Sequence, residues 1–178
     1  MKSIVSLFLI HIFFLSSLHA EESFYLMPRD AKTAISDLAN DLKNAKKEIL
    51  VAIYSFTHKE LAQSLKKAAK RGVAVTIIFD EESNKPKSYS RIGDLAKIRS
   101  IRCYTLKGLP NKNKGYYGKM HMKLAIIDGK KVYFGSANWS NSAFSRNYEL
   151  LYSSDSPALI NKAGNYFSEI LKVSKPYD

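Results

Sequence analysis

The pattern of apolar and polar residues divides most of the chain into segments with either helical or strand periodicity. Apolar residues recur at helical spacing in residues 33–47 and form a buried run in residues 48–56. The same criteria predict further helices at residues 57–71, 88–100 and 157–173, and further strands at residues 73–79, 101–106, 120–127, 132–134 and 149–152. Residues 21–30 are predicted to be a short connection, residues 107–119 a flexible loop, and residues 140–146 a turn or short helix.

The order of these segments predicts an α/β domain. A strand, a helix and a second strand follow one another over residues 48–79, which is typical of parallel pairing with a right-handed crossover. Asp128-Gly129, between two apolar runs, predicts a tight hairpin. We therefore expect one domain over residues 21–178, built on a mixed, largely parallel sheet flanked by helices.

The predicted hairpin brings several polar residues together. His121 and Lys123 are two positions apart in an apolar alternating run, so both side chains share one face of a strand. The return strand carries Ser136 back toward His121, and Asn138 and Glu149 follow it. We expect an imidazole, an ammonium, a hydroxyl, the two amides of Asn138 and Asn147, and a carboxylate to converge on one site.

Such a site is suited to displacement at phosphorus. Histidine can attack as a nucleophile, and lysine can bind a phosphate oxygen as a compact cation. Ser136 and Asn138 can donate hydrogen bonds to the same oxygens, and Glu149 can hold the imidazole in one tautomer. The residues therefore indicate a phosphohistidine intermediate. The sequence has no Cys/His cluster and no dense carboxylate group, so we expect no metal and no other cofactor.

The spacing of these residues resembles the HKD motif of the phospholipase D superfamily. The pattern H-x-K-x4-D followed by x6-G-S-x-N is matched in full by His121, Lys123, Asp128, Gly135, Ser136 and Asn138. Asn147 and Glu149 also resemble the acidic position after the motif. The resemblance covers roughly residues 24–172 and is greatest to the small, single-motif bacterial endonucleases of that superfamily.

This resemblance implies a metal-independent phosphodiesterase in which His121 is the nucleophile. It also implies that Lys123 and Asn138 bind phosphate, that Ser136 and Glu149 support them, and that Asp128 organises the motif. Larger members carry two HKD motifs that share one site, whereas this chain has one. The resemblance therefore implies a homodimer, in which His121 of each subunit faces the other and one imidazole protonates the leaving oxygen.

The charge of the chain favours an anionic partner. The sequence has 28 Lys and Arg against 16 Asp and Glu, a formal net charge of +12, which fits nucleic acid or an anionic membrane surface. The predicted loop at residues 107–119 leads directly to His121. Lysines can follow a phosphate backbone and aromatic rings can stack on unpaired bases, so substrate contact, with a preference for single strands, is expected from Lys112, Lys114, Tyr116 and Tyr117.

Residues 1–20 are predicted to be a signal peptide or an uncleaved N-terminal membrane anchor. Lys2 is followed by a mostly apolar run over residues 4–18, and Ala20 offers a cleavage site. Leu18 is a poor match three residues before that site, so both interpretations stay open. We expect export to the cell envelope, as a periplasmic, membrane-associated or secreted protein.

Three other polar groups have structural interpretations. Cys103 lies in a predicted strand and is expected to be a buried thiol. His58 is interpreted as an exposed residue in the first turn of a helix that begins with a capping box at Thr57. Asp80, with the two acids after it, is interpreted as a solvated strand end.

Three functions are compatible with these features. The leading hypothesis is an exported endonuclease acting on DNA or RNA, in DNA uptake or scavenging. The alternative is a phospholipase D-type lipid phosphodiesterase or phosphatidyltransferase at the membrane. Against this alternative, the sequence shows no amphipathic apolar stretch beside the site for acyl chains. A third hypothesis is a nucleic-acid-binding module without catalysis, in which His121 would be dispensable.

Overall fold

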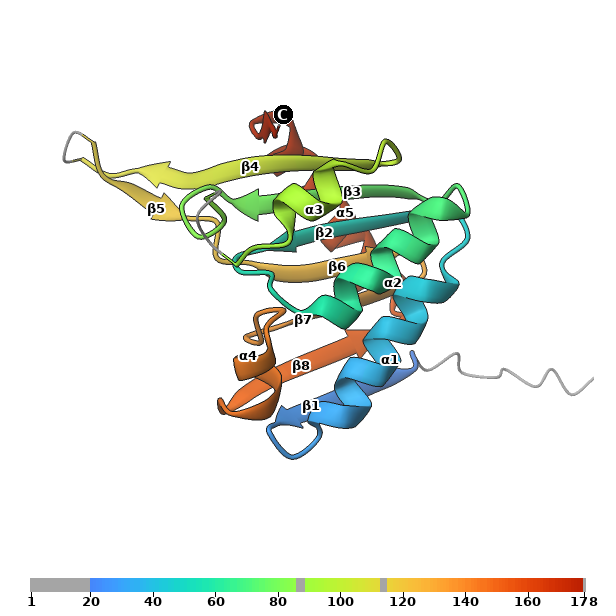
Figure 1. Ribbon diagram of the computed structural model, residues 1–178. Helices are drawn as coiled ribbons and strands as arrows, with labels where there is room; N and C mark the ends of the chain where they lie inside the picture. The colour runs from blue at the N-terminus through green and yellow to red at the C-terminus, as the bar shows by residue number, and fades with distance from the viewer. Residues whose placement is uncertain (1–19, 86–88, 113–114, 178) are drawn as a thin grey trace, which may run out of the picture.

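A computed structural model describes residues 20–85, 89–112 and 115–177 (Figure 1). Residues 1–19 of the predicted signal segment and the predicted substrate-binding residue Lys114 lie outside the described residues. No helix within the described ranges is both long and apolar enough to cross a membrane.

The described residues form one sheet with helices on both faces (Figure 1). The strands are β1 (Glu22–Met27), β2 (Glu48–Ile53), β3 (Ala74–Asp80), β4 (Ile101–Pro110), β5 (Tyr117–Lys119), β6 (Lys123–Ile127), β7 (Lys131–Gly135), β8 (Glu149–Ser154) and β9 (Lys175–Pro176). The helices are α1 (Ala31–Asn44), α2 (Lys59–Lys70), α3 (Ile92–Ala96), α4 (Asn141–Ser145) and α5 (Pro157–Lys172).

The strand order is β1-β8-β7-β6-β2-β3-β4-β5, with β9 paired to β4. The expected mixed sheet flanked by helices is confirmed. Among the named strands parallel pairing is limited to β2, β3 and β4, because helical segments cross over between these strands. The other strand pairs are antiparallel, so the sheet is mixed as expected but mainly antiparallel rather than largely parallel. The strand β6 is antiparallel to both of its neighbours, β2 and β7.

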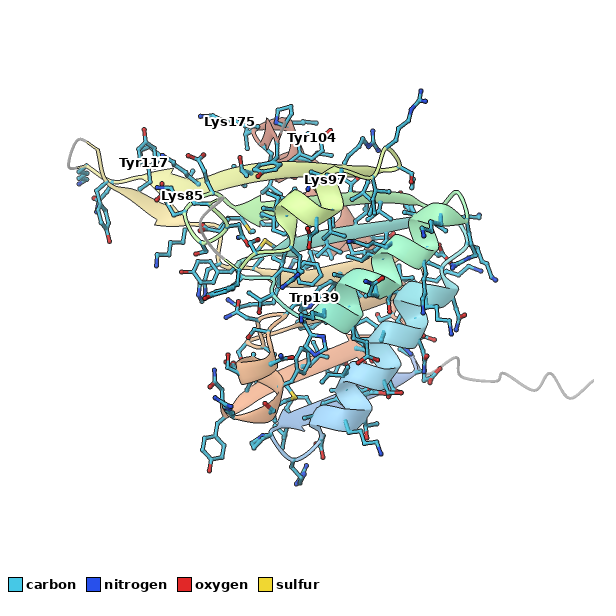
Figure 2. The ribbon with its side chains drawn as sticks, in the orientation of Figure 1. Lys85, Lys97, Tyr104, Tyr117, Trp139 and Lys175 are labelled. Carbon is cyan, nitrogen blue, oxygen red and sulfur yellow. The ribbon has the colours of Figure 1, made fainter. Side chains whose placement is uncertain are left out.

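Two segments that were predicted to lack regular structure are strands at the edges of the sheet. The predicted connection at residues 21–30 contains β1, which pairs antiparallel with β8. The predicted loop at residues 107–119 is a hairpin, because β4 continues to Pro110 and β5 pairs back onto it. Gly108 allows this pairing, since a Cβ there would lie 2.3 Å from the carbonyl carbon of Gly118. The hairpin projects beyond the body of the domain and carries Tyr117 (Figure 2).

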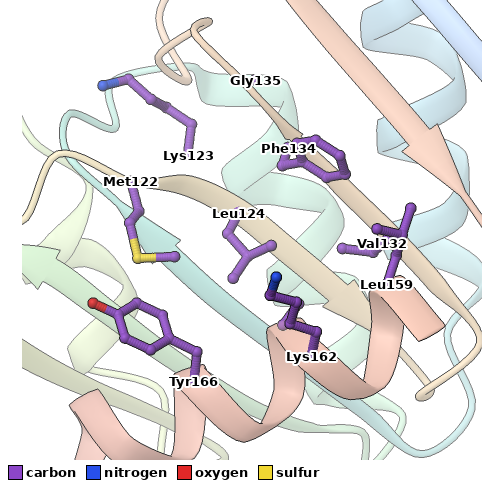
Figure 3. Close-up of a pocket in the computed structure, with 10 residues that line it drawn as sticks. Met122, Lys123, Leu124, Val132, Phe134, Gly135, Leu159, Lys162 and Tyr166 are labelled. Atoms are coloured by element: carbon purple, nitrogen blue, oxygen red, sulfur yellow. The ribbon is translucent and has the colours of Figure 1, made fainter. Parts of the chain in front are cut away.

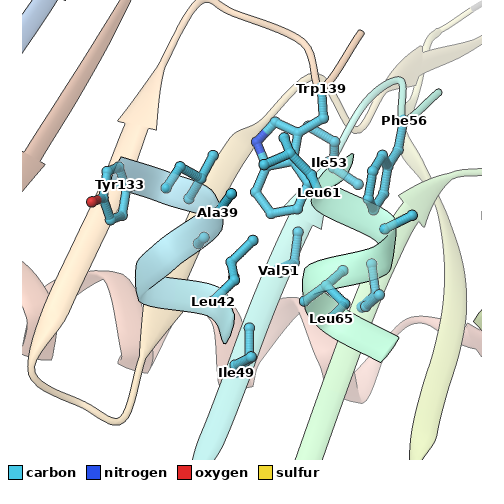
Figure 4. Close-up of a cluster of buried hydrophobic side chains, with 14 of the residues drawn as sticks. Ala39, Leu42, Ile49, Val51, Ile53, Phe56, Leu61, Leu65, Tyr133 and Trp139 are labelled. Atoms are coloured by element: carbon cyan, nitrogen blue, oxygen red, sulfur yellow. The ribbon is translucent and has the colours of Figure 1, made fainter. Parts of the chain in front are cut away.

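The larger part of the core lies between the sheet and helices α1 and α2 (Figure 4). These helices bury Leu38, Leu42, Leu61 and Leu65 against the strands. A smaller cluster lies between the opposite face and α5. Ala125 and Ile127 of β6 belong to the first cluster and Leu124 and Ile126 to the second, so β6 is buried on both faces. The thiol of Cys103 is buried as predicted, and this burial raises its pKa to about 12.

The predicted turn between β6 and β7 is confirmed and is anchored by a carboxylate. Asp128 and Gly129 have φ values of 55° and 61°, which is the left-handed pair of a type I′ turn. The Asp128 carboxylate accepts hydrogen bonds from the backbone N–H groups of Lys46, Lys47 and Glu48, at 2.7–3.1 Å. Burial raises the pKa of Asp128, but these hydrogen bonds outweigh that effect and hold its pKa below the usual value.

We expect Asp128→Asn to lower the free energy of unfolding at pH 7 by about 1–3 kcal/mol, because three backbone donors lose a charged acceptor. Asparagine tolerates the same left-handed φ, so the change isolates the carboxylate. A lowered folded-state pKa contributes stability above the unfolded-state pKa of about 3.9, and that stability is lost as the pH falls through the folded value. The difference from wild type should therefore shrink in acid.

Urea unfolding of both proteins between pH 7 and pH 3 measures this difference. Asp94→Asn is the control, because the carboxylate of Asp94 is half exposed in an ion pair with Arg91. Its effect should stay within about 0.5 kcal/mol. Equal losses in the two variants would contradict the anchoring role of Asp128.

Candidate active site

His121 and Lys123 lie together at the start of β6. The side chain of His121 is exposed, whereas Lys123 is buried, with 6% exposure. The Lys123 Nζ lies 2.8 Å from the His121 carbonyl oxygen, and 3.1 and 3.3 Å from the two nitrogens of the imidazole. The expectation that these two side chains share one side of the chain agrees with this geometry.

The electrostatic environment favours a neutral imidazole. Burial lowers the pKa of His121, and the positive charges of Lys123 and Lys119 lower it further. Burial also lowers the pKa of Lys123. At neutral pH the imidazole therefore keeps a free lone pair beside a cation, which is the state required of a nucleophile.

Tyr54 and Lys119 complete the surroundings of the imidazole, and the sequence reasoning did not find them. The Tyr54 ring centroid lies 4.3 Å from that of His121. The Lys119 Nζ donates a hydrogen bond to the Tyr54 Oη at 3.0 Å. Tyr54 is the residue after β2. In the sequence it looks like the last residues of a buried strand, and nothing marks it as part of a site.

A buried carboxylate fixes the backbone next to His121. Asp80, at the end of β3, is 1% exposed and accepts hydrogen bonds from the N–H of Met120 at 3.0 Å and of Ser83 at 2.9 Å. The prediction that Asp80 belongs to a solvated strand end is therefore wrong. The backbone N–H of Met120 needs an acceptor here because it lies between β5 and β6.

Ser136 and Glu149 lie at the matching ends of β7 and β8. The Ser136 hydroxyl donates to the Glu149 carboxylate and accepts from the Leu150 N–H at 3.0 Å. Among the described residues, the other partner of Glu149 is the amide of Asn147, so this carboxylate supports Ser136 and is not bonded to the imidazole of its own chain. Gly135 lets the strands approach, since a Cβ there would lie 2.3 Å from the Leu150 oxygen.

Trp139 attaches the segment carrying Ser136 and Asn138 to the end of β2. The backbone N–H of Trp139 donates to the Ser55 carbonyl oxygen at 3.1 Å. Its backbone carbonyl accepts from the backbone N–H groups of Thr57 and His58, both at 2.8 Å. The indole is 2% exposed in the core (Figures 2 and 4). Within the described residues the Asn138 Oδ1 is buried and has no hydrogen-bond partner, which leaves a polar group to be satisfied by a ligand or water.

His58 is a structural residue, as expected, but its position differs from the predicted one. It is 6% exposed, and its imidazole caps α2 by accepting from the Leu61 N–H. Burial lowers its pKa. The predictions that His58 is exposed and that Thr57 is the cap are therefore wrong, because the chain turns into α2 one residue later.

Comparison with known proteins identifies this arrangement. The family described as "Cardiolipin synthase, PLD-like domain" matches residues 38–171. The chain belongs to this phospholipase D-like family. It is also similar in structure to NucT from Helicobacter pylori, with a TM-score of 0.87 and 40% identity over 89% of this chain and 100% of that one. The expected resemblance to small bacterial members of the superfamily is thereby confirmed.

Two further comparisons extend this result. Nuc from Salmonella typhimurium, a phospholipase D family member, has a TM-score of 0.74 and 24% identity over 89% of this chain and 99% of that one, which shows the shared fold. The mitochondrial cardiolipin hydrolases of Danio rerio and Xenopus laevis are each 27% identical over 84% and 82% of this chain. This chain spans 62% and 63% of those two proteins.

The phospholipase D-like domain does not bring every predicted site residue to His121. Asp128 lies at the opposite end of β6, where it organises the turn and contacts no reacting group. Lys112, Tyr116 and Tyr117 are exposed on the projecting hairpin. Their contact with substrate stays a prediction, as do the roles of the motif residues. In the part of the chain that the structure describes, no group of three or more His, Cys, Asp or Glu side chains could hold a metal.

An apolar cavity of about 430 Å³ adjoins the site of this phospholipase D-like domain, between β6, β7 and α5 (Figure 3). It is lined by Met122, Lys123, Leu124, Val132, Phe134, Gly135, Leu159, Lys162, Ala163 and Tyr166. The sequence has no amphipathic apolar stretch beside the site for acyl chains, but the fold forms an apolar cavity there from separate segments. Sequence reasoning missed the cavity because its walls come from strand and helix segments far apart in the chain.

We expect Lys123→Ala to raise the pKa of His121, because it removes a positive charge that disfavours the imidazolium. Histidine C–H signals, followed by NMR from pH 4 to 9, measure the change. His58 is the internal control, because its pKa is lowered mainly by burial. An unchanged pKa of His121, or equal shifts of both histidines, would contradict the electrostatic coupling.

Proposed function

We propose that this protein is a metal-independent phosphodiesterase that cleaves nucleic acid through a covalent phosphohistidine. The observation that carries the proposal is the exposed His121 imidazole beside the Lys123 ammonium, whose Nζ lies 3.1 Å from the Nδ1. This pair combines a neutral nucleophile with a cation for the phosphate. Ser136 and Asn138 lie on the adjoining segment, and the unpartnered Asn138 Oδ1 leaves its amide free to reorient toward substrate.

The reaction takes two displacements at phosphorus. In the first, the His121 nitrogen attacks, a P–N bond forms, and the bond from phosphorus to the leaving oxygen breaks. That oxygen takes a proton from an imidazolium, which is the partner's His121 in a homodimer. In the second displacement, the partner's imidazole, now neutral, takes a proton from water, the water oxygen bonds to phosphorus, and the P–N bond breaks.

Nucleic acid is the substrate class that the charge distribution favours. The chain has a formal net charge of +12, and the projecting β4–β5 hairpin (Figure 1) ends at Lys119, two residues before His121. On this hairpin Tyr116 is 66% and Tyr117 46% exposed, so both rings are available for stacking on unpaired bases. The similarity to NucT covers 100% of that solved chain, which supports a single domain of the same fold. A preference for single-stranded DNA belongs to this proposal.

A homodimer with a shared site is part of the proposal. Among the described residues, His121 is the only histidine at the site, while the two displacements need two imidazoles. Phe24, Leu26, Phe134 and Leu150 are 37–58% exposed on the neighbouring strands β1, β8 and β7. This apolar surface adjoins the cavity beside Lys123, which makes it suitable for contact with a second subunit.

A lipid phosphodiesterase is the second candidate, and the apolar cavity favours it. An acyl chain could occupy the cavity while the phosphate meets Lys123, and the cardiolipin hydrolases named above are relatives of this chain. A membrane anchor at residues 1–20 would bring such a site to lipid. We rank this function second because the basic hairpin has no role in it. Export, and a role in DNA uptake or scavenging, accompany the nuclease proposal.

We expect the domain over residues 21–178 to cleave labelled single-stranded DNA in excess EDTA, and His121→Ala to lose at least ~10³-fold in rate. Product separation on gels measures both. Cleavage that needs a metal, or that survives in His121→Ala, would contradict the mechanism. Release of headgroup from cardiolipin vesicles, without cleavage of DNA or RNA, would favour the second candidate.

We also expect His121→Ala subunits to inactivate wild-type subunits when the two are refolded together. If each site needs His121 from both chains, activity should fall as the square of the wild-type fraction. The mixing control is Lys70→Ala, which changes the last residue of α2. Mixtures with this variant should keep activity proportional to total protein. A linear decline with His121→Ala would show that one subunit suffices.

A further inference from the structure

The candidate site contains a second cation that the proposed mechanism does not use. Lys119 ends β5, two residues before His121, and its side chain is exposed. The Lys119 Nζ lies 3.0 Å from the Tyr54 Oη and 5.4 Å from the centroid of the Tyr54 ring. The Lys123 Nζ lies 5.0 Å from the same centroid. One aromatic ring therefore contacts two ammonium groups and the nucleophilic imidazole.

Both ammonium groups are held by neutral partners. Lys119 donates to a phenol and Lys123 to the His121 carbonyl oxygen. Within the described residues neither ammonium lies at ion-pair distance from a carboxylate. Asp80 is the carboxylate that raises the pKa of Lys119 electrostatically from a longer distance. The cross-strand neighbour Lys107 differs, since its Nζ lies 3.2 Å from Glu81 and 3.7 Å from Glu82.

This difference decides which lysine can bind an anion. The charge of Lys107 is largely neutralised by its two carboxylates, whereas the charge of Lys119 faces solvent beside His121. An ammonium held by a neutral hydroxyl keeps its attraction for a phosphate oxygen. The Tyr54 oxygen accepts from Lys119, and a phenol can also donate its own proton, so Tyr54 can bond to the same phosphate. Hydrogen bonds from Ser83 and Lys119 also lower the pKa of Tyr54, which makes it a stronger donor.

The spacing of the cations indicates what they bind. Lys119, His121 and Lys123 alternate at intervals of two residues from β5 into β6. The Nζ atoms of Lys119 and Lys123 lie 5.4 and 5.0 Å from the centroid of the same Tyr54 ring, so they are at most about 10 Å apart, a range that includes the separation of consecutive phosphates in a single strand. We propose that Lys119 and Tyr54 form a subsite for the phosphate next to the scissile one in single-stranded nucleic acid.

This subsite rests on the proposed nuclease function and makes it more specific. A phosphodiester with one phosphate fills the His121–Lys123 position and leaves the Lys119–Tyr54 position empty. A polynucleotide fills both. The enzyme should therefore gain affinity from a second phosphate, and the gain should depend on salt because it arises from one charge contact.

The first test measures binding of a fluorescent single-stranded oligodeoxynucleotide at increasing KCl, in a His121→Ala background that cannot cleave it. Lys119→Gln should weaken binding about tenfold at low salt and reduce the slope of log K against log salt by about 0.7. Lys119→Arg should restore both. Tyr54→Phe keeps the ring and both charges, so it should weaken binding by less and leave the slope in place.

Lys70→Gln is the matched control, because it removes one exposed lysine from the end of α2. It should leave the affinity and the slope at the values of the parent. An equal reduction of the slope in Lys70→Gln and Lys119→Gln, or an unchanged slope in Lys119→Gln, would overturn the subsite.

The second test compares two substrates in the active protein. Bis(p-nitrophenyl) phosphate has one phosphate and serves as the reference for the oligodeoxynucleotide. Lys119→Gln should lower the ratio of kcat/KM for the oligodeoxynucleotide to that for the small ester about tenfold. Equal losses on both substrates would overturn the subsite. Failure of the wild type to hydrolyse either substrate would instead overturn the proposed function.

Discussion

The direction of β6 is the constraint on which the site depends. The parallel strands β2 and β3 have their carboxyl ends side by side, where Tyr54 and Asp80 lie. Because β6 is antiparallel to β2, its first residues lie beside those carboxyl ends. The N–H of Tyr54 donates to the Met122 oxygen at 2.9 Å, and Asp80 accepts from the N–H of Met120. These two hydrogen bonds flank His121 and fix its backbone at the carboxyl ends of parallel strands, where α/β proteins often bind ligands.

The second half of the site is held by packing. The segment after β7 could not follow its path without the close approach of Gly135 to β8 and the burial of Trp139 against Phe56, at a ring separation of 4.9 Å. The parallel bridge between these two aromatic residues joins the end of β2 to the segment carrying Asn138. The same core residues that stabilise the domain therefore bring Ser136 and Asn138 to the edge at which β6 begins.

Local periodicity was enough to predict the central elements, because each buried strand and amphipathic helix repeats its apolar residues at its own spacing. It failed for β1 and for the β4–β5 hairpin. In β1, an edge strand, buried Tyr25 and Met27 alternate with exposed apolar Phe24 and Leu26, so its apolar residues show no clear period. In the hairpin, β5 and the part of β4 after Leu106 have no buried side chain. β1 becomes regular by pairing with β8, which is distant in the sequence, and the hairpin by pairing of its own two strands.

The same distinction separates the predicted site residues from those that were missed. His121 and Lys123 are neighbours in sequence, and their spacing alone puts them together. Tyr54, Asp80 and Lys119 come from three other strand ends, and each has an ordinary local interpretation. The prediction for Asp128 followed from its place in the motif. Its position in the fold, with the carboxylate on the N–H groups of Lys46 and Lys47, gives it a structural task at the far end of β6.

The cations around the imidazole connect substrate binding with the protonation of His121. Without substrate, Lys123 and Lys119 disfavour the imidazolium, and the neutral ring is ready to attack. A bound phosphate brings negative charge to the same two ammonium groups and offsets their field at the ring. In the proposed mechanism this offset stabilises the imidazolium that donates its proton to the leaving oxygen. If these lysines were paired with carboxylates, their effect on the imidazole would already be offset before substrate binds. Their partners are instead the neutral phenol of Tyr54 and the carbonyl of His121, so the effect is retained until a phosphate binds.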